Sequence, residues 1–450
     1  MFLVAISSYF TDSILRAPTI GCILMGICAS LVGVISVLRK RSLLGETLSH
    51  ATYPGVTLAI VVIAIMSGKY PEEITLAVGV LVGASLTALL GLKAVDTLEQ
   101  KWSVKDDAAL CLVLASFFGL GTTVASLIQV KYSSLYNQIQ GYLYGQPATM
   151  TDFHIRIYGL LTVVTILVIS VFYKEIKLVS FDRAYAQTIG INTKLIDNLI
   201  VILIVLAIVA GIRSVGIVLM SAMLIAPAVA ARQYTNNLYT MFILASLFGG
   251  GSGFLGNYIA VEFSIRHAHT QEIYSLPTGP LIVLVTSAIC FISLCFSPSR
   301  GLIIKWYRSV TFRYTALQEN ILKAFWRQGP DKPLSLYEIA TLNSTSRFSM
   351  GLILYHLQRE GWITYNFAAK TYTLSLDGVL RASQIVRLHR LWEVYLVDYL
   401  GVGAERVHKS AEEMEHIITP ALEKELNILL NNPRYDPHQQ PIPPSKGLWQ

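Results

Sequence analysis

Long apolar stretches recur along the first 300 residues and most limit how this chain can fold. A helix needs ~20 mostly apolar residues to cross a bilayer. The pattern predicts an all-α polytopic membrane domain with about nine transmembrane helices, although Arg213 alone separates the sixth from the seventh and these two could form one bent unit. The expected spans lie near 19–38, 52–67, 73–92, 108–129, 156–173, 195–212, 214–231, 241–259 and 279–297.

Charged residues are distributed unevenly along the chain. The first 300 residues contain 32 Asp, Glu, Lys and Arg, and the last 150 contain 31. The overall share of 14% lies well below the ~25% of soluble proteins, which argues against an ordinary soluble enzyme and against a disordered protein. We therefore expect a membrane domain over 1–300, a basic juxtamembrane linker over 301–316, and two soluble domains over 317–378 and 379–450.

Basic residues in the connections predict the orientation of the membrane domain, because cytoplasmic loops are enriched in Lys and Arg. If the loop after the first span is cytoplasmic, that side collects eleven Lys and Arg and the other side five. The amino terminus is then outside, and with an odd number of spans everything after about residue 299 is cytoplasmic. The basic and aromatic stretch 297–315 is expected to lie against membrane lipid.

Two polar segments interrupt the apolar pattern. Glu46 and His50 stand four residues apart in LRKRSLLGETLSHATYPG, so on a helix they share one face. A carboxylate and an imidazole inside a membrane suit a transition-metal ion in transit, but both could instead lie at the interface in contact with water. The charged stretch 174–194 has an amphipathic centre that ends at Gly190. It predicts either a short helix that docks on a partner or an ordinary solvated loop.

These segments, in this order, resemble the permease subunit of ABC importers for zinc, manganese or iron. The resemblance covers roughly 15–297 and is carried by RKRSLLGETLSHATYPG, FDRAYAQTIGI, VGIVLMSAMLIAPAVAA and TGPLIVLV. It implies a multi-pass protein of the cytoplasmic (inner) membrane. It also implies a pore made with a second permease chain, identical or paralogous, that receives metal from an extracytoplasmic metal-binding protein and is driven by a separate ATPase subunit.

By position, the resemblance assigns roles to particular residues. Glu46 and His50 lie on the transport path, although the family usually has Asp where Glu46 stands. Contact with the ATPase falls to Asp182, Arg183, Ala186 and Gly190. The sequence contains no GxxxxGK[ST] phosphate loop, so we expect this chain to bind no nucleotide and to be a transporter subunit, not an enzyme.

The last third begins with the pattern of a winged helix-turn-helix. Helices are expected over 317–328, 334–342 and 345–359, followed by a hairpin made of ITYNF and TYTLS. Such a fold can place its last helix in a DNA major groove, and it also serves as a protein–protein module. The DNA-contacting residues are expected at the polar and basic start of that helix, namely Thr345, Ser346, Arg347 and Ser349.

Two further helices carry candidate metal ligands. A helix over 381–400 has His389 and Glu393 four residues apart, and a helix over 405–418 would place four more on one stripe. Imidazoles and carboxylates without thiols suit a divalent ion such as Mn²⁺ or Fe²⁺, whereas the alternative is a solvated helix face. The full candidate set is His389, Glu393, His408, Glu412, Glu415 and His416.

The region 317–444 resembles the diphtheria-toxin-repressor family of iron- and manganese-dependent transcriptional repressors. The quoted match is RLHRLWEVYLVDYLGVGAERVHKSAEEMEHIITPALEKELNILLNNPRYDPHQQPIP. It implies a homodimer that binds operator DNA, with the same six residues as ligands in two neighbouring sites. Where some members have Cys or Met, this chain has Glu412 and either Glu319 or Asn320, which leans toward manganese.

The two resemblances together predict one chain with two tasks, import of iron, manganese or zinc and metal-dependent repression. Because a repressor tethered to a membrane reaches DNA poorly, we expect proteolysis within 297–315 to release the tail. The alternative is a tethered metal sensor that gates transport and never binds DNA.

Overall fold

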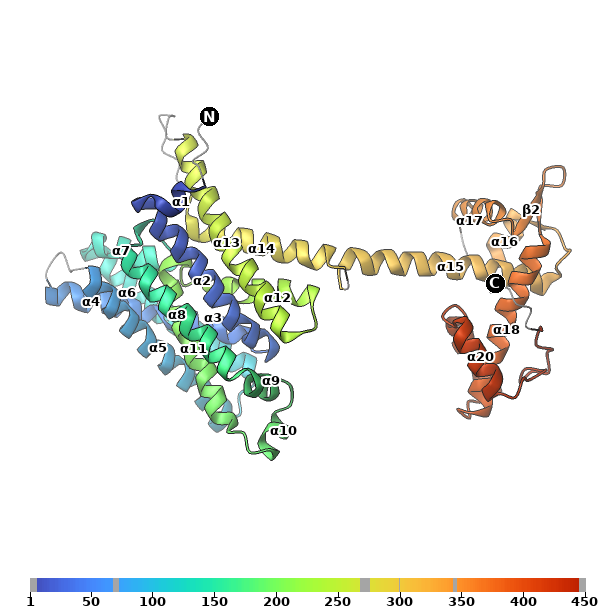
Figure 1. Ribbon diagram of the computed structural model, residues 1–450, viewed down its shortest axis with the longest axis horizontal. Helices are drawn as coiled ribbons and strands as arrows, with labels where there is room; N and C mark the ends of the chain where they lie inside the picture. Colours follow the sequence, from blue (N-terminus) through green and yellow to red (C-terminus); the bar gives the residue numbers. More distant parts are fainter. Residues whose placement is uncertain (1–5, 68–72, 268–275, 299, 343–345, 445–450) are drawn as a thin grey trace. The chain divides into compact units, whose positions relative to one another are not determined.

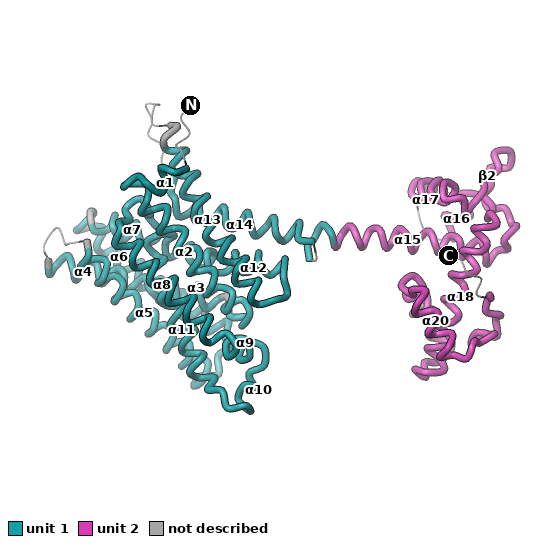
Figure 2. The backbone as a smooth tube through the Cα atoms, in the orientation of Figure 1, with its two compact units in different colours: residues 1–304 teal, residues 305–450 magenta. Residues whose placement is uncertain are grey.

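The computed structural model describes residues 6–67, 73–267, 276–298, 300–342 and 346–444. It divides into two compact units, residues 1–304 and residues 305–450 (Figure 2). Each unit has its own hydrophobic core. The second unit also contains two small satellite clusters around Leu388 and Leu391.

Unit 1 is entirely helical over its described residues (Figure 1). Eight segments are long and apolar enough to cross a bilayer, and the shorter helices connect or flank them. The elements are α1 (Ser8–Thr11), α2 (Ser13–Leu38), α3 (Ser42–Ala51), α4 (Tyr53–Ser67), α5 (Glu73–Trp102), α6 (Asp106–Lys131), α7 (Ser133–Tyr144), the 3₁₀ helix η1 (Pro147–Thr149), α8 (Asp152–Val171), α9 (Tyr173–Phe181), α10 (Arg183–Thr188), α11 (Thr193–Val215), α12 (Met220–Tyr234), α13 (Leu238–His267) and α14 (Thr278–Phe296).

The expected ninth span, 214–231, is a shorter element than the sequence suggested. Its helix α12 has only 15 residues, because the chain turns at Gly216, where φ is +95°, and stays non-helical to residue 219. Gly279 at the start of α14 packs against the carbonyl of Val215, and the hydroxyl of Ser297 just after α14 donates to the carbonyl of Gln233. Residues 216–234 thus run from the Val215 end of α11 toward Ser297, but α12 is too short to count as a span of its own. The described residues contain eight candidate spans, one fewer than the nine we expected.

Ion pairs near the start of α11 help to show at which end the chain leaves unit 1. Asp197, in the first turn of α11, pairs with Arg39 at 2.6 Å and with Arg183 at 2.8 Å. The end of α2, the helix α10 and the start of α11 therefore lie at one end, and Val215 lies at the other. Val215 lies beside Gly279 at the start of α14, and Ser297 follows the other end of that helix. The chain therefore leaves unit 1 at the end that carries α10.

Close backbone approach holds the centre of unit 1 together. A Cβ atom on Gly26 would lie 2.2 Å from the carbonyl oxygen of Gly249 in α13. A Cβ on Gly33 would lie 1.8 Å from the carbonyl oxygen of Leu224 in α12. Only glycine permits these approaches, and small residues at helix crossings are the usual means of association in lipid.

Unit 2 begins in α15 (Leu302–Gln328) and contains the expected winged helix-turn-helix. No Gly or Pro interrupts residues 302–328, so the expected linker 301–316 and the helix expected from 317 are one continuous helix that ends before Gly329-Pro330. There follow β1 (Leu334–Ser335), α16 (Leu336–Leu342), α17 (Arg347–Arg359), β2 (Ile363–Asn366) and β3 (Thr371–Leu374).

The three strands form an antiparallel sheet in the order β1-β3-β2. The hairpin pairs Ile363 with Leu374 and Asn366 with Thr371. The core beneath it joins α15, α16 and α17 and includes Ile321, Leu322, Phe325, Ile339, Met350, Leu354 and Leu357. Burial of these apolar side chains supplies the main stabilisation of this part.

The remaining elements are α18 (Leu376–Asp398), the 3₁₀ helix η2 (Ala404–Arg406), α19 (Val407–Met414) and α20 (Pro420–Leu429). The helix expected over 405–418 is shorter, and Glu415 and His416 lie in the turn after it. The reason is Pro420, which starts α20 and requires an extended residue before it. Thr419 is extended and accepts a hydrogen bond from the backbone N–H of Leu422.

Candidate metal sites and partner surfaces

The transport-path candidates lie where a membrane helix is broken. α3 and α4 together form one apolar segment, Leu43–Met66, interrupted at Thr52. His50 is buried in the last turn of α3, its ring meets that of Phe118 edge-on at 4.7 Å, and its Nδ1 has no hydrogen-bond partner among the described residues. Glu46, one turn earlier, is half-buried. Both residues thus lie within the span, on one face of α3.

The ATPase-contact candidates form a capped surface helix. Asp182 caps α10 by accepting a hydrogen bond from the backbone N–H of Tyr185 at 2.9 Å. Arg183 pairs with Asp197 at 2.8 Å, Ala186 is fully buried, and Gly190 ends the turn at φ +84°. The sequence did not single out the large apolar side chains on this surface, Phe181, Tyr185 and Ile189, which are all more than half exposed.

The expected DNA-contacting residues lie at the start of α17. Ser346 is its N-cap, and its hydroxyl accepts from the backbone N–H of Ser349 at 3.3 Å. Thr345 and the side chain of Arg347 lie outside the described residues. The exposed face of the helix is more apolar than expected, because Phe348, Leu352 and Tyr355 are 80%, 54% and 64% exposed. Their i, i+4, i+7 spacing was visible in the sequence.

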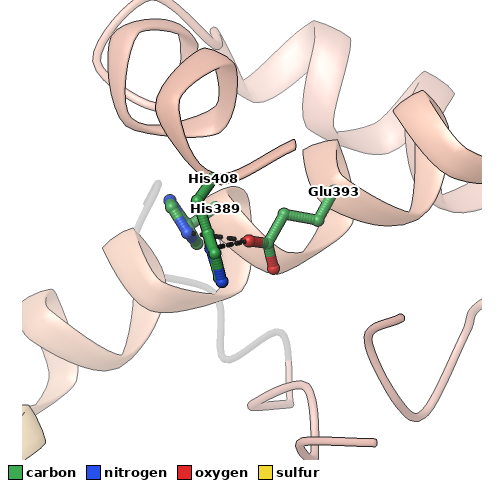
Figure 3. A group of neighbouring side chains, drawn as sticks. All are labelled: His389, Glu393 and His408. Atoms are coloured by element: carbon green, nitrogen blue, oxygen red, sulfur yellow. Dashed lines mark ion pairs between the residues drawn. The ribbon is translucent and has the colours of Figure 1, made fainter. Parts of the chain in front are cut away.

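Three of the six metal-ligand candidates come together on α18 and α19 (Figure 3). One ligand atom each from His389, Glu393 and His408 lies within 4.8 Å of the others, and this is the one such group in the described part of the chain. Glu393 Oε1 is 3.2 Å from His389 Nε2 and 2.5 Å from His408 Nδ1. His389 and Glu393 are buried, whereas the side chain of His408 is 58% exposed. The group therefore has a buried base and one open side.

This group meets the chemical requirements for a divalent metal ion. His389 Nε2 and Glu393 Oε1 are buried and face each other, and Glu393 Oε1 also faces His408. Burial raises the pKa of Glu393, but the imidazoles of His389 and His408 outweigh it and hold the pKa below its usual range. Two nitrogen donors and one ionised oxygen, with an open side for water, suit Mn²⁺, Fe²⁺ or Zn²⁺.

A further imidazole lies beside the open side. The rings of His408 and His438 stack at 4.6 Å, with an angle of 11° between their planes. Asp436 fixes the turn that carries His438, since its Oδ1 accepts from the backbone N–H of His438 at 2.8 Å. Sequence reasoning missed His438, because no helical spacing relates it to the other candidates and only the tertiary fold brings it there.

Of the other three candidates, Glu415 and His416 form ion pairs with residues of α15, whereas Glu412 forms none with a described residue. Glu415 accepts from Lys323 Nζ at 2.9 and 2.7 Å, and its Oε2 is 2.5 Å from His389 Nδ1. His416 Nδ1 is 2.6 Å from Glu319, which also pairs with Arg381 at 2.7 Å. Glu412 is exposed and lines a cavity with Asn320 and Arg327. The six candidates thus do not converge on one point.

Comparison with known proteins accounts for both units. Residues 11–297 match the model of the ABC 3 transport family, and residues 376–444 match the iron dependent repressor, metal binding and dimerisation domain. A probable metal transport system membrane protein of Chlamydia trachomatis is 34% identical over 447 residues, which cover 97% of this chain and 98% of that protein.

Two shorter relatives match the permease part. The zinc transport system membrane protein TroC of Treponema pallidum is 34% identical over 316 residues, 70% of this chain and 99% of that protein. The solved structure of PsaBC from Streptococcus pneumoniae in complex with Fab matches 66% of this chain and 96% of its own, with 28% identity and a TM-score of 0.55. The chain belongs to the ABC 3 transport family of metal permeases, and it carries a repressor-type metal-binding and dimerisation domain at its carboxyl end.

Proposed function

We propose that unit 1 forms half of a pore that imports divalent manganese, iron or zinc, and that unit 2 is a metal-activated repressor that reports on the imported ion. The observation that carries the proposal is the His389–Glu393–His408 group, because it stands in a repressor-type domain on the same chain as a metal permease. Import would then silence further synthesis of the importer.

The pore does no covalent chemistry in this proposal. Glu46 and His50 offer an oxygen and a nitrogen donor to a passing ion at the α3–α4 break, and a separate ATPase docks on α10. Exposed apolar side chains beside a well-capped helix, Phe181, Tyr185 and Ile189, support this contact. An extracytoplasmic metal-binding protein and a second permease chain complete the transporter. Replacing His50 by Ala should abolish uptake of radiolabelled Mn²⁺ without loss of assembly, and normal uptake would remove His50 from the path.

Metal acts on the tail by linkage. The ion binds His389, Glu393 and His408 in the dimer whose two α17 helices are spaced for successive major grooves, so metal shifts the population toward the DNA-binding state. The test is binding of its own promoter DNA by the full-length protein in detergent and by residues 310–450, each with and without Mn²⁺ or Fe²⁺. No metal-dependent shift, even at low salt, would overturn repression.

A tethered repressor reaches DNA only if it is released or if DNA approaches the membrane. Residues 302–312 include exposed apolar and aromatic side chains, Trp306 and Tyr307 among them, and we propose that cleavage within 297–315 frees unit 2 into the cytoplasm. Immunoblotting of the tail in native cells should show a soluble fragment. Full-length protein alone, always in the membrane fraction, would exclude release.

The second candidate function is gating of transport by a tethered metal sensor. The apolar face of α17, formed by Phe348, Leu352 and Tyr355, favours it, since such a surface suits a protein partner. Replacing Leu352 by Ser should change uptake if unit 2 gates the pore. It should change promoter binding instead if α17 enters a groove.

A further inference from the structure

Lys323 of α15 is the buried cation next to the proposed metal group. Its side chain is 4% exposed, and that of Glu415, which it faces, is 0% exposed. Nζ lies 2.9 and 2.7 Å from the two oxygens of Glu415 and 3.1 Å from His389 Nδ1. Carboxylate oxygens around a positive centre are donors that would otherwise bind a divalent ion.

We infer that the ammonium group of Lys323 is a built-in cation that fills the second cation position of the tail, so that unit 2 takes one metal ion per chain at His389, Glu393 and His408. The inference rests on the proposed metal binding of the tail. It concerns the three candidate donors, Glu412, Glu415 and His416, that do not join the His389–Glu393–His408 group.

Electrostatics prevents a second ion from sharing this position with Lys323. A divalent cation on Glu415 would lie within a few ångströms of the ammonium group, in a buried environment where repulsion is poorly screened. Lys323 also lines the adjoining cavity, where the Arg327 guanidinium would repel its ammonium group and the Glu412 carboxylate would attract it. Of the other candidate donors, His416 turns its Nδ1 to Glu319 and its Nε2 to Glu415 at 3.7 Å, and Glu412 is exposed.

Lys323 and Glu415 instead position His389 for the one ion. His389 Nδ1 lies 2.5 Å from Glu415 Oε2, so an Nδ1–H can donate to the carboxylate. That tautomer leaves the lone pair of Nε2 free toward Glu393 and His408. A carboxylate behind a ligand histidine is the usual way to fix its orientation. Glu415 is therefore a positioning residue, and Lys323 holds it.

The test counts metal on the full-length protein in detergent, in a background with Glu46→Gln and His50→Ala so that the pore does not contribute. After equilibrium dialysis against Mn²⁺, mass spectrometry of the metal should give one equivalent per chain. Lys323→Glu replaces the cation by a further oxygen donor and should raise the count to two. Lys370→Glu makes the same charge change at an exposed position and should leave it at one.

Each other outcome has a defined meaning. Two equivalents in the background protein, or one in a folded Lys323→Glu variant, would overturn the role of Lys323. Unchanged metal content in His408→Ala would instead overturn the proposed metal group itself. If Lys323→Glu does not fold, Lys323→Met/Glu415→Met removes both charges. It should still bind one Mn²⁺, with affinity reduced about 10- to 100-fold, and unchanged affinity would contradict the positioning role.

Discussion

The two units bury very different polar groups. Among the described residues, Glu262 is the one Asp, Glu, Lys or Arg that is buried in unit 1, whereas unit 2 buries seven, including Lys323, Arg387 and Glu423. Glycines in unit 1 let helix backbones touch, whereas buried charges in unit 2 neutralise one another beside its apolar core. The contrast follows from the solvent, because lipid gives no hydrophobic drive for helix association, while a small soluble unit can place its charges in pairs.

The largest expected effect tests the glycine contacts of unit 1. Gly33→Leu should prevent α2 and α12 from packing, because a Cβ alone would already lie 1.8 Å from the carbonyl oxygen of Leu224. We expect loss of the monodisperse protein peak in detergent and of metal uptake. Gly119→Leu is the matched control, since a Cβ there meets nothing within 4 Å. Equal behaviour of the two variants would contradict the importance of close approach.

The next effect tests the buried charges of unit 2. Arg387 contacts Glu423 at 3.0 Å and Asn427 at 2.5 Å, so Arg387→Met leaves a buried carboxylate without its partner. We expect the free energy of unfolding of residues 305–450 to fall by about 3–5 kcal/mol in urea denaturation.

Two controls define this result. Arg387→Met/Glu423→Met removes both charges and should recover most of the loss, which a purely steric effect of the Met side chain would not allow. Arg313→Met at an exposed position should change the free energy by no more than about 0.5 kcal/mol.

A smaller change in the free energy of unfolding is expected when metal binds unit 2. Mn²⁺ at a hundred times its dissociation constant should add about 2.7 kcal/mol to unit 2, seen as a higher midpoint of thermal unfolding after chelator-treated protein is reloaded. His408→Ala should lose this increase, because it removes a ligand on the open side of the group. An equal increase in that variant would place the ion elsewhere.

The smallest effect concerns local capping in unit 2. Ser375 caps α18 by accepting from the backbone N–H of Gly378 at 2.9 Å, and Ser375→Ala should cost about 1 kcal/mol in urea denaturation. Ser383→Ala within the same helix should be nearly neutral, because that hydroxyl only bonds back to the carbonyl of Leu380. If Ser375→Ala lowered the free energy of unfolding much more than Arg387→Met does, local hydrogen bonds would contribute more to the stability of unit 2 than buried charges.

Much of the fold could be predicted from local patterns. Apolar runs of membrane length predicted the spans, and Gly329-Pro330 predicted the end of α15. The shortened α12 and α19 could not be predicted from apolar or helical periodicity, because their limits depend on Gly216 and on Thr419-Pro420. Of these, the Thr-Pro signal was readable and was missed.

The sequence by itself determined which groups are available. The membrane part has one Glu-x-x-x-His pair, and the candidate metal donors of the last third are nitrogen and oxygen atoms. Helical spacing was enough to bring His389 and Glu393 together. Only the tertiary structure decided that Lys323, 92 residues from Glu415 in the chain, neutralises that carboxylate, and that His438 reaches His408. The physical reason is that spacing fixes neighbours along one helix, whereas the partners of a buried charge depend on how separate helices pack.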